Sequence, residues 1–142
     1  MKKLFLLMGA FLLLSSSAFA IQQRVVLSPK DAFSYSVKRV DNVLHVNVTP
    51  ALDIYVYDDK LKFEVIKPKK IDYTSKLKRP KPISYQEHLV HMDPVDVEIP
   101  IAMIKKDVNG ESFTFRLSFQ GCAKAGICYS PMHYDYMFFF DE

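Results

Sequence analysis

The two cysteines of the sequence, Cys122 and Cys128, are the residues best suited to chemistry. They are separated by five residues, lie between two strand-like runs and have Gly121 and Gly126 beside them. A pair this close can form an exchangeable disulfide, because one sulfur can be attacked while the other leaves and returns. As a structural bridge it would stabilise the fold by only about 2.4 kcal/mol, against about 4 kcal/mol for a loop of about sixty residues. Spacing alone leaves a structural and an exchanging disulfide both open.

The first twenty residues have the pattern of a secretory signal peptide. A positively charged start precedes an apolar run over residues 4–14 and an A-x-A pattern that ends at Ala20, where cleavage is expected. The run is too short to span a bilayer, which takes about 20 apolar residues. We therefore expect a signal peptide over residues 1–20 and one exported domain over residues 21–142. In an oxidising compartment two cysteines are paired by default.

The charge of the chain is nearly balanced. The sequence has 19 Lys and Arg residues against 16 Asp and Glu residues, and two of the lysines lie in the predicted signal peptide. This balance argues against nucleic acid as a partner. Residues 67–82 are the exception, because they are rich in lysine and proline. We expect an exposed connection there, and its charge also suits docking to an acidic partner or a lipid surface.

Alternating apolar and polar residues predict strands throughout the exported chain and no helix. The expected strands cover residues 25–28, 33–37, 44–48, 54–57, 61–65, 95–101, 113–120 and 134–140. Asp41-Asn42 predicts a turn, and Asn109-Gly110 predicts a tight turn between strands at residues 101–106 and 112–119. Pro100 inside a strand pattern indicates a sheet edge or a bulge. About eight short antiparallel strands in one domain predict an all-β, immunoglobulin-like β-sandwich.

Residues 119–131 carry a family resemblance. Their sequence, FQGCAKAGICYSP, closely resembles the Y-Q-G-C-A-x-A-G-x-C-Y-x-P signature of the N-terminal periplasmic domain of the thiol:disulfide interchange protein DsbD. Residues 28–33, 54–57 and 97–101 also match this family. The resemblance implies a disulfide between the last two strands and no cofactor, since the electrons travel as thiols. It also implies that Cys128 forms the mixed disulfide with partners and that Cys122 resolves it.

The same resemblance implies a covered site. In the family an aromatic cap loop lies over the disulfide and opens when a partner docks. The matching region is about residues 83–90, with Tyr85 as the candidate cap residue. Tyr55, Tyr57 and Tyr129 are expected to wall the site.

The resemblance also implies protein partners and a subcellular location. Family members are periplasmic, take electrons from a thioredoxin-like domain of their own protein, and pass them to thioredoxin-fold periplasmic proteins such as disulfide isomerases and the cytochrome c maturation thioredoxin. They continue into membrane helices and a second periplasmic domain, whereas this sequence reads to Glu142. Two expectations stay open: a fragment of such a protein, or a free-standing domain served by a membrane electron donor of the DsbD or CcdA type.

Two other functions fit parts of the sequence. A non-catalytic periplasmic binding module would use the disulfide only as a structural bridge. A copper-handling protein would use soft or borderline ligands, and the candidates beside the cysteines are His88, His91, Met92, Met132 and His133. Scattered His and Met residues more often pack in the core or face solvent, so we expect no metal site.

Overall fold

The computed structural model describes residues 26–141, so the predicted signal peptide lies outside the described residues. In chain order its elements are α1 (Pro29–Ala32), β1 (Phe33–Val40), β2 (Val43–Pro50), β3 (Ile54–Tyr57), the 3-10 helix η1 (Asp58–Lys60), β4 (Lys62–Lys67), β5 (Ile71–Asp72), the 3-10 helix η2 (Thr74–Lys76), β6 (Ile83–Tyr85), β7 (His88–His91), β8 (Val95–Pro100), α2 (Ile101–Asp107), β9 (Ser112–Phe119), β10 (Gly121–Ala123) and β11 (Met132–Phe139). Within this part of the chain, no helix is long and apolar enough to cross a membrane.

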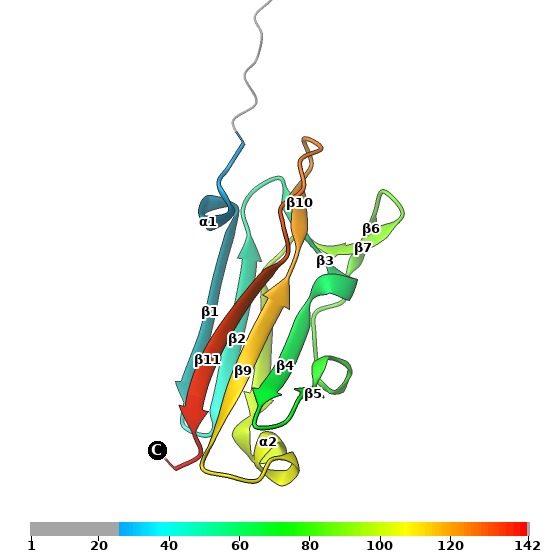
Figure 1. Cartoon of the computed structure of the whole chain (residues 1–142). Helices are drawn as coiled ribbons and strands as arrows, with labels where there is room; N and C mark the ends of the chain where they lie inside the picture. The colour runs from blue at the N-terminus through cyan, green and yellow to red at the C-terminus, as the bar shows by residue number, and fades with distance from the viewer. Residues whose placement is uncertain (1–25, 142) are drawn as a thin grey trace, which may run out of the picture.

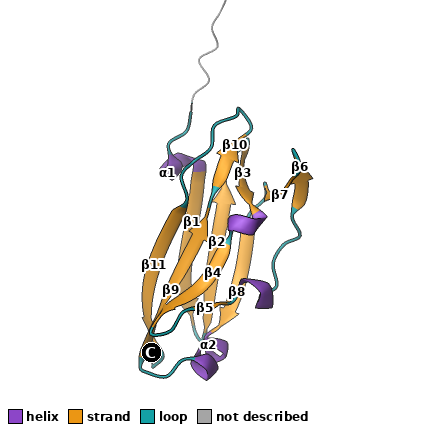
Figure 2. Cartoon of the chain, turned by 45° about the vertical axis from the view of Figure 1, so that its right-hand side comes forward, coloured by secondary structure: helices purple, strands orange, loops and turns teal. Residues whose placement is uncertain are grey.

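Two antiparallel sheets stack face to face, with strand orders β1-β2-β8 and β11-β9-β4-β5 (Figure 1). A third antiparallel sheet, β10-β3-β7-β6, extends one end of this sandwich. Figures 1 and 2 show β10 and the β6–β7 hairpin at that end and α2 at the opposite end. This arrangement confirms the predicted all-β, immunoglobulin-like sandwich.

The core explains why the alternating patterns were informative. Along β2 every second side chain is buried, and Phe113, Phe115 and Leu117 of β9 meet this layer from the facing sheet. Successive side chains of a strand point to opposite faces, so each strand contributes one apolar row to the core. Burying each such side chain contributes about 1.5–3 kcal/mol. The predicted turn at Asp41-Asn42 is also confirmed, since it joins β1 to β2.

The prediction of no helix was wrong at two places. Residues 26–28 form no strand; instead Ser28 caps α1, and its side-chain oxygen accepts a hydrogen bond from the backbone of Asp31. Residues 101–106, expected as a strand before a tight turn, belong to α2, which buries Ile101 and Ile104. A short apolar run fits a buried helix as well as a strand. Pro100 does end an edge strand, β8.

The lysine-rich connection over residues 67–82 is more ordered than expected. It contains β5 and η2, and the side chain of Tyr73 is fully buried. The Tyr73 hydroxyl donates a hydrogen bond of 2.9 Å to Asp107 Oδ2 at the end of α2. The lysines of this segment therefore face solvent from a backbone that is fixed against the core.

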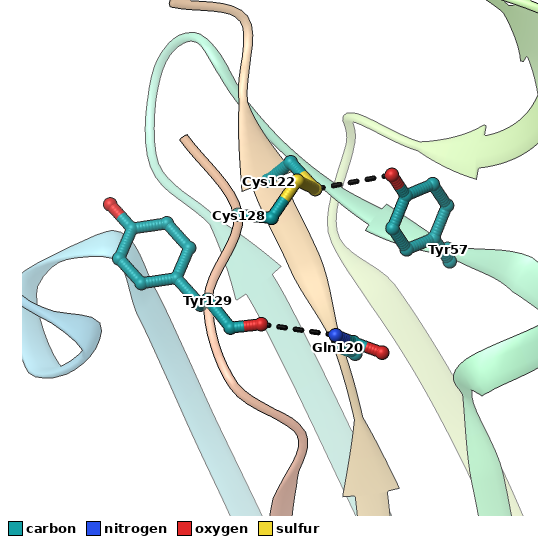
Figure 3. Close-up of a disulfide and its surroundings, with 5 residues drawn as sticks. All are labelled: Tyr57, Gln120, Cys122, Cys128 and Tyr129. Carbon is teal, nitrogen blue, oxygen red and sulfur yellow. Dashed lines mark hydrogen bonds between the residues drawn. A yellow bond between two sulfur atoms is a disulfide. The ribbon is translucent and has the colours of Figure 1, made fainter. Parts of the chain in front are cut away.

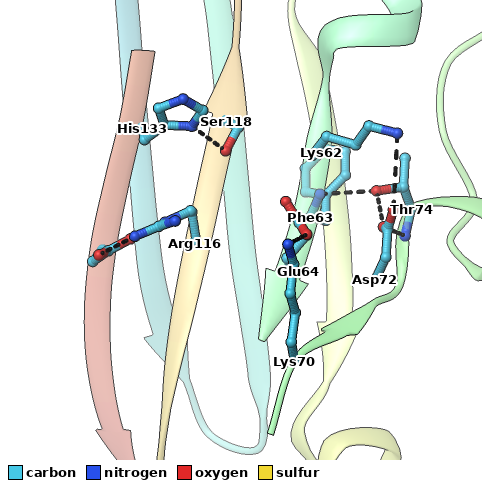
Figure 4. Close-up of polar contacts among 10 residues, drawn as sticks. Lys62, Phe63, Glu64, Lys70, Asp72, Thr74, Arg116, Ser118 and His133 are labelled. Atoms are coloured by element: carbon cyan, nitrogen blue, oxygen red, sulfur yellow. Dashed lines mark hydrogen bonds and ion pairs between the residues drawn. The ribbon is translucent and has the colours of Figure 1, made fainter. Parts of the chain in front are cut away.

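Ordered polar contacts cover the outer face of the β11-β9-β4-β5 sheet (Figure 4). Arg116 of β9 donates two hydrogen bonds to Asp135 of β11, at 2.7 and 2.9 Å. Two residues further along each strand, Nδ1 of His133 lies 2.7 Å from the Ser118 hydroxyl. These cross-strand pairs fix the register of β11 on β9.

Candidate redox-active site

The two cysteines form a disulfide at the end of the sandwich, with an S–S distance of 2.11 Å, which confirms the predicted pairing. Cys122 lies in β10 opposite Tyr55 of β3. The chain then turns back on itself, with Ala123 N–H donating to the Ile127 carbonyl at 2.7 Å and Tyr129 N–H to the Gly121 carbonyl at 3.0 Å. Gly126 supplies the left-handed conformation of this turn, at φ +97°.

The two sulfurs of the bridge have different surroundings. Cys122 is 0% exposed, whereas Cys128 is exposed. Attack on a disulfide requires access to one sulfur along the S–S bond. Cys128 is therefore the more accessible of the two cysteines to an external thiolate.

Tyr57 touches the buried sulfur. Its hydroxyl lies 3.1 Å from Cys122 Sγ (Figure 3), and because a disulfide sulfur carries no hydrogen, the hydroxyl is the donor. The Tyr55 ring meets the Tyr57 ring edge-on at 5.7 Å between centroids. Burial and the hydrogen bond with Tyr57 raise the pKa of the Tyr55 hydroxyl. Both predicted tyrosines of β3 thus lie beside the bridge.

The β6–β7 hairpin carries the predicted cap residue. Tyr85 packs against the small cluster formed by Cys122, Tyr55 and Val90, with 5.0 Å between the Tyr85 and Tyr55 ring centroids. The turn of the hairpin, Gln86-Glu87, has positive φ at both residues, 48° and 67°. This is the geometry of a two-residue hairpin turn, although glycine, asparagine or aspartate usually occupies it.

Two further side chains join the hairpin to the site. His88 lies edge-on to Tyr57, with ring centroids 5.2 Å apart. Lys124, within the disulfide loop, places its ammonium 5.9 Å from the centre of the Tyr85 ring and 3.9 Å from Asp53. Sequence reasoning had no signal for these contacts, since they depend on the pairing of both β7 and β10 with β3.

The side chain of Tyr129, which was expected to line the site, does not lie beside Tyr55 and Tyr57. Its ring packs edge-on against Phe33 in the main core at 5.3 Å, and its hydroxyl donates to the Leu27 carbonyl at 2.8 Å. Figure 3 shows the ring directed away from the disulfide. Residues 128 and 129 are neighbours on an extended chain, so their side chains point to opposite sides.

Three of the candidate copper ligands, His91, His133 and Met92, make contacts of other kinds. Among residues 26–141, no three His, Cys, Asp or Glu side chains gather in a way that could hold a metal ion. His91 pairs with Asp58, His133 contacts Ser118, and Met92 packs against the cluster around Cys122.

A disulfide between one exposed and one buried cysteine, at the end of an immunoglobulin-like sandwich, suits a thiol–disulfide exchange domain. Residues 23–138 match the family model described as "Thiol:disulfide interchange protein DsbD, N-terminal". The chain therefore belongs to the family of DsbD N-terminal domains.

Individual relatives and solved structures agree with this assignment. The DsbD protein of Neisseria meningitidis serogroup B is 31% identical over 144 residues, which cover 98% of this chain and 23% of that protein. The DsbD protein of Campylobacter jejuni (strain RM1221) is 25% identical over 106 residues, which cover 75% of this chain and 18% of that protein. The chain thus spans about a quarter or less of the length of these curated relatives.

Two solved structures show the same fold. The reduced N-terminal domain of Neisseria meningitidis DsbD superposes with a TM-score of 0.59 at 23% identity, covering 80% of this chain and 90% of that chain. The complex between the DsbD N-terminal and PilB N-terminal domains from the same species gives a TM-score of 0.58 at 23% identity, covering 80% and 88% of the two chains.

Proposed function

We propose that residues 21–142 form a periplasmic domain that relays reducing equivalents by thiol–disulfide exchange, acting as the relay part of a protein-disulfide reductase. Its donor is a membrane or thioredoxin-like electron carrier, and its clients are oxidised thioredoxin-fold periplasmic proteins of the disulfide isomerase and cytochrome c maturation classes. The observation that carries this proposal is the disulfide between one exposed residue, Cys128, and one buried residue, Cys122.

The reductive half of the cycle starts at the sulfur of the exposed residue. A donor thiolate attacks Cys128 Sγ, the bond between the two cysteine sulfurs breaks, and Cys122 leaves as a thiolate that then takes up a proton. The hydroxyl of Tyr57 is placed to donate to this developing thiolate, and a better stabilised leaving thiolate leaves faster. The second donor thiol then attacks the donor sulfur of the mixed disulfide. This step releases Cys128 as a thiol and leaves the donor oxidised by two electrons.

The second half of the cycle passes the electrons on to a client. The Cys128 thiolate attacks the client disulfide and forms a mixed disulfide, and one client sulfur leaves as a thiolate. Cys122 then attacks Cys128 Sγ, which restores the disulfide of the domain and releases the client as a dithiol. Tyr85 acts as the cap, and Tyr55 and Tyr57 line the site against which a partner docks. The complex of a DsbD N-terminal domain with a PilB N-terminal domain supports docking of a partner domain.

The test is a trapping experiment with single-cysteine variants. A thioredoxin-fold periplasmic protein that keeps only its exposed active-site cysteine is activated with thionitrobenzoate and mixed with each reduced variant. Cys122→Ser should release the chromophore and form a covalent complex. Cys128→Ser should react far more slowly, because its remaining thiol, that of Cys122, is buried. Equal trapping by Cys128→Ser would reverse the two roles. If neither variant forms the complex, the exchange function is wrong.

A redox titration separates this proposal from a binding module with a structural bridge. Structural disulfides of exported proteins typically have reduction potentials below about −300 mV, and exchanging ones lie higher. Equilibration of the wild-type protein with a series of dithiol buffers, followed by counting of free thiols, gives the value directly. A potential below that limit would favour the binding module.

A further inference from the structure

A polar cluster at the end of β3 has no part in the exchange steps above. Asp58 directly follows Tyr57, and its Oδ1 lies 2.7 Å from His91 Nε2 and 3.1 Å from Arg79 Nη1. The side chains of His91, Asp58 and Arg79 are only 3%, 20% and 23% exposed. One carboxylate therefore joins the end of β3, the end of β7 and the connection that precedes β6.

The position of this cluster matters because the pairing that it supports is short. β3 and β7 share two residue pairs, Val56 with His91 and Tyr57 with Val90. β7 is the second strand of the β6–β7 hairpin, and its His88 ring contacts the Tyr57 ring edge-on. A ladder of two pairs holds a hairpin weakly by itself, because few hydrogen bonds oppose the conformational entropy of the strand. The cluster adds a charge-assisted contact between Arg79 and Asp58 at the end of this ladder.

We propose that Arg79, Asp58 and His91 form a clamp that positions Tyr57 against Cys122, with Asp58 as its central positioning residue. The clamp fixes the residue after Tyr57 and the strand opposite it. Tyr57 is also fixed from the other side, where its backbone N–H donates to the Gln120 carbonyl at 2.9 Å. With both sides fixed, the Tyr57 hydroxyl stays within hydrogen-bond reach of the leaving sulfur. The inference rests on the proposed exchange function.

The clamp is tested through Tyr57 in a double-mutant cycle. The measured quantity is the rate at which dithiothreitol reduces the disulfide of the oxidised protein. Tyr57→Phe removes the donor to a developing thiolate and should slow reduction about tenfold. Asp58→Asn should slow it about threefold, as expected when a neighbouring contact weakens without removing the donor. Asp59→Asn is the matched control, because it removes the same charge from the exposed adjacent position, and its rate should equal that of wild type.

The combined variant decides whether Asp58 acts through Tyr57. If it does, Asp58→Asn causes no further slowing of the reduction in the Tyr57→Phe background. A threefold slowing in that background would overturn the proposal, as would a wild-type rate for Asp58→Asn alone. If the wild-type protein itself is not reduced and forms no mixed disulfide, the exchange function fails, which is a different result.

A second readout distinguishes positioning from a general loss of stability. In the reduced Cys128→Ser protein, ultraviolet thiolate absorbance reports the pH at which Cys122 ionises. Asp58→Asn should raise that midpoint, because the Tyr57 hydroxyl no longer stabilises the thiolate, and an unchanged midpoint would contradict the clamp. If Asp58→Asn does not fold, Arg79→Gln and Arg79→Lys replace it. The Gln variant should slow reduction and the Lys variant should restore much of the rate; equal rates for the two would also overturn the proposal.

Discussion

Replacement of Gly121 by alanine tests the close approach of β10 to β3. A Cβ atom at Gly121 would overlap the backbone carbonyl oxygen of Tyr55 and lie 2.9 Å from the Phe33 ring. The carbonyl belongs to the paired strand, so a side-chain rotation cannot relieve the overlap. Overpacking of this kind costs about 1–3 kcal/mol and more when backbone must move. We take about 3 kcal/mol as the expected loss, because the obstructing atom is main chain.

The assay is thermal unfolding of the oxidised protein followed by circular dichroism. For a domain of a little over 100 residues, about 3 kcal/mol lowers the melting temperature by about 12 °C. Gly126→Ala and Gly110→Ala are the controls: both positions have positive φ, at 97° and 131°, and neither would place a Cβ within 4 Å of another atom. Each control should lose about 1 kcal/mol through backbone strain alone, or about 4 °C. If Gly121→Ala melts no lower than the controls, the packing argument is refuted.

Three other outcomes are expected. Tyr73→Phe, which removes the hydrogen bond to Asp107, should destabilise the protein to urea by about 1–2 kcal/mol, and an unmoved midpoint would contradict the role of this contact. The hydrogen bonds from Arg116 lower the pKa of Asp135, so the carboxylate stabilises the fold above its unfolded pKa and loses this effect as pH falls through its folded pKa. Asp135→Asn should therefore be less stable than wild type near neutral pH, with the difference vanishing in acid; a pH-independent difference would argue otherwise. Lys124→Met should speed hydrogen exchange of the β6–β7 hairpin about two- to fivefold, the equivalent of about 0.5–1 kcal/mol for a cation–π contact, and unaltered exchange would show that Lys124 does not hold the hairpin.

The sequence by itself determined the longer strands and the reactive pair, but not the short strands β5, β6, β7 and β10. Period-two alternation is a local property, since neighbouring side chains of a strand must point to opposite faces, so β2 and β9 could be predicted before any contact was known. The spacing of Cys122 and Cys128 is equally local, because only five residues lie between them. Short apolar runs have no such definite period, which is why the helix at Ile101–Asp107 was missed.

Only the tertiary structure decided which groups surround the sulfurs. Arg79 and Asp58 are 21 residues apart, and His91 is 33 residues from Asp58, so their meeting depends on how β3, β7 and the connection pack together. The pairing of β7 with β3 likewise brings His88 onto Tyr57. The same packing buries Cys122, leaves Cys128 at the surface and turns Tyr129 into the core. Burial and strand register are set by contacts between segments far apart in the chain, and no local pattern of residue types specifies them.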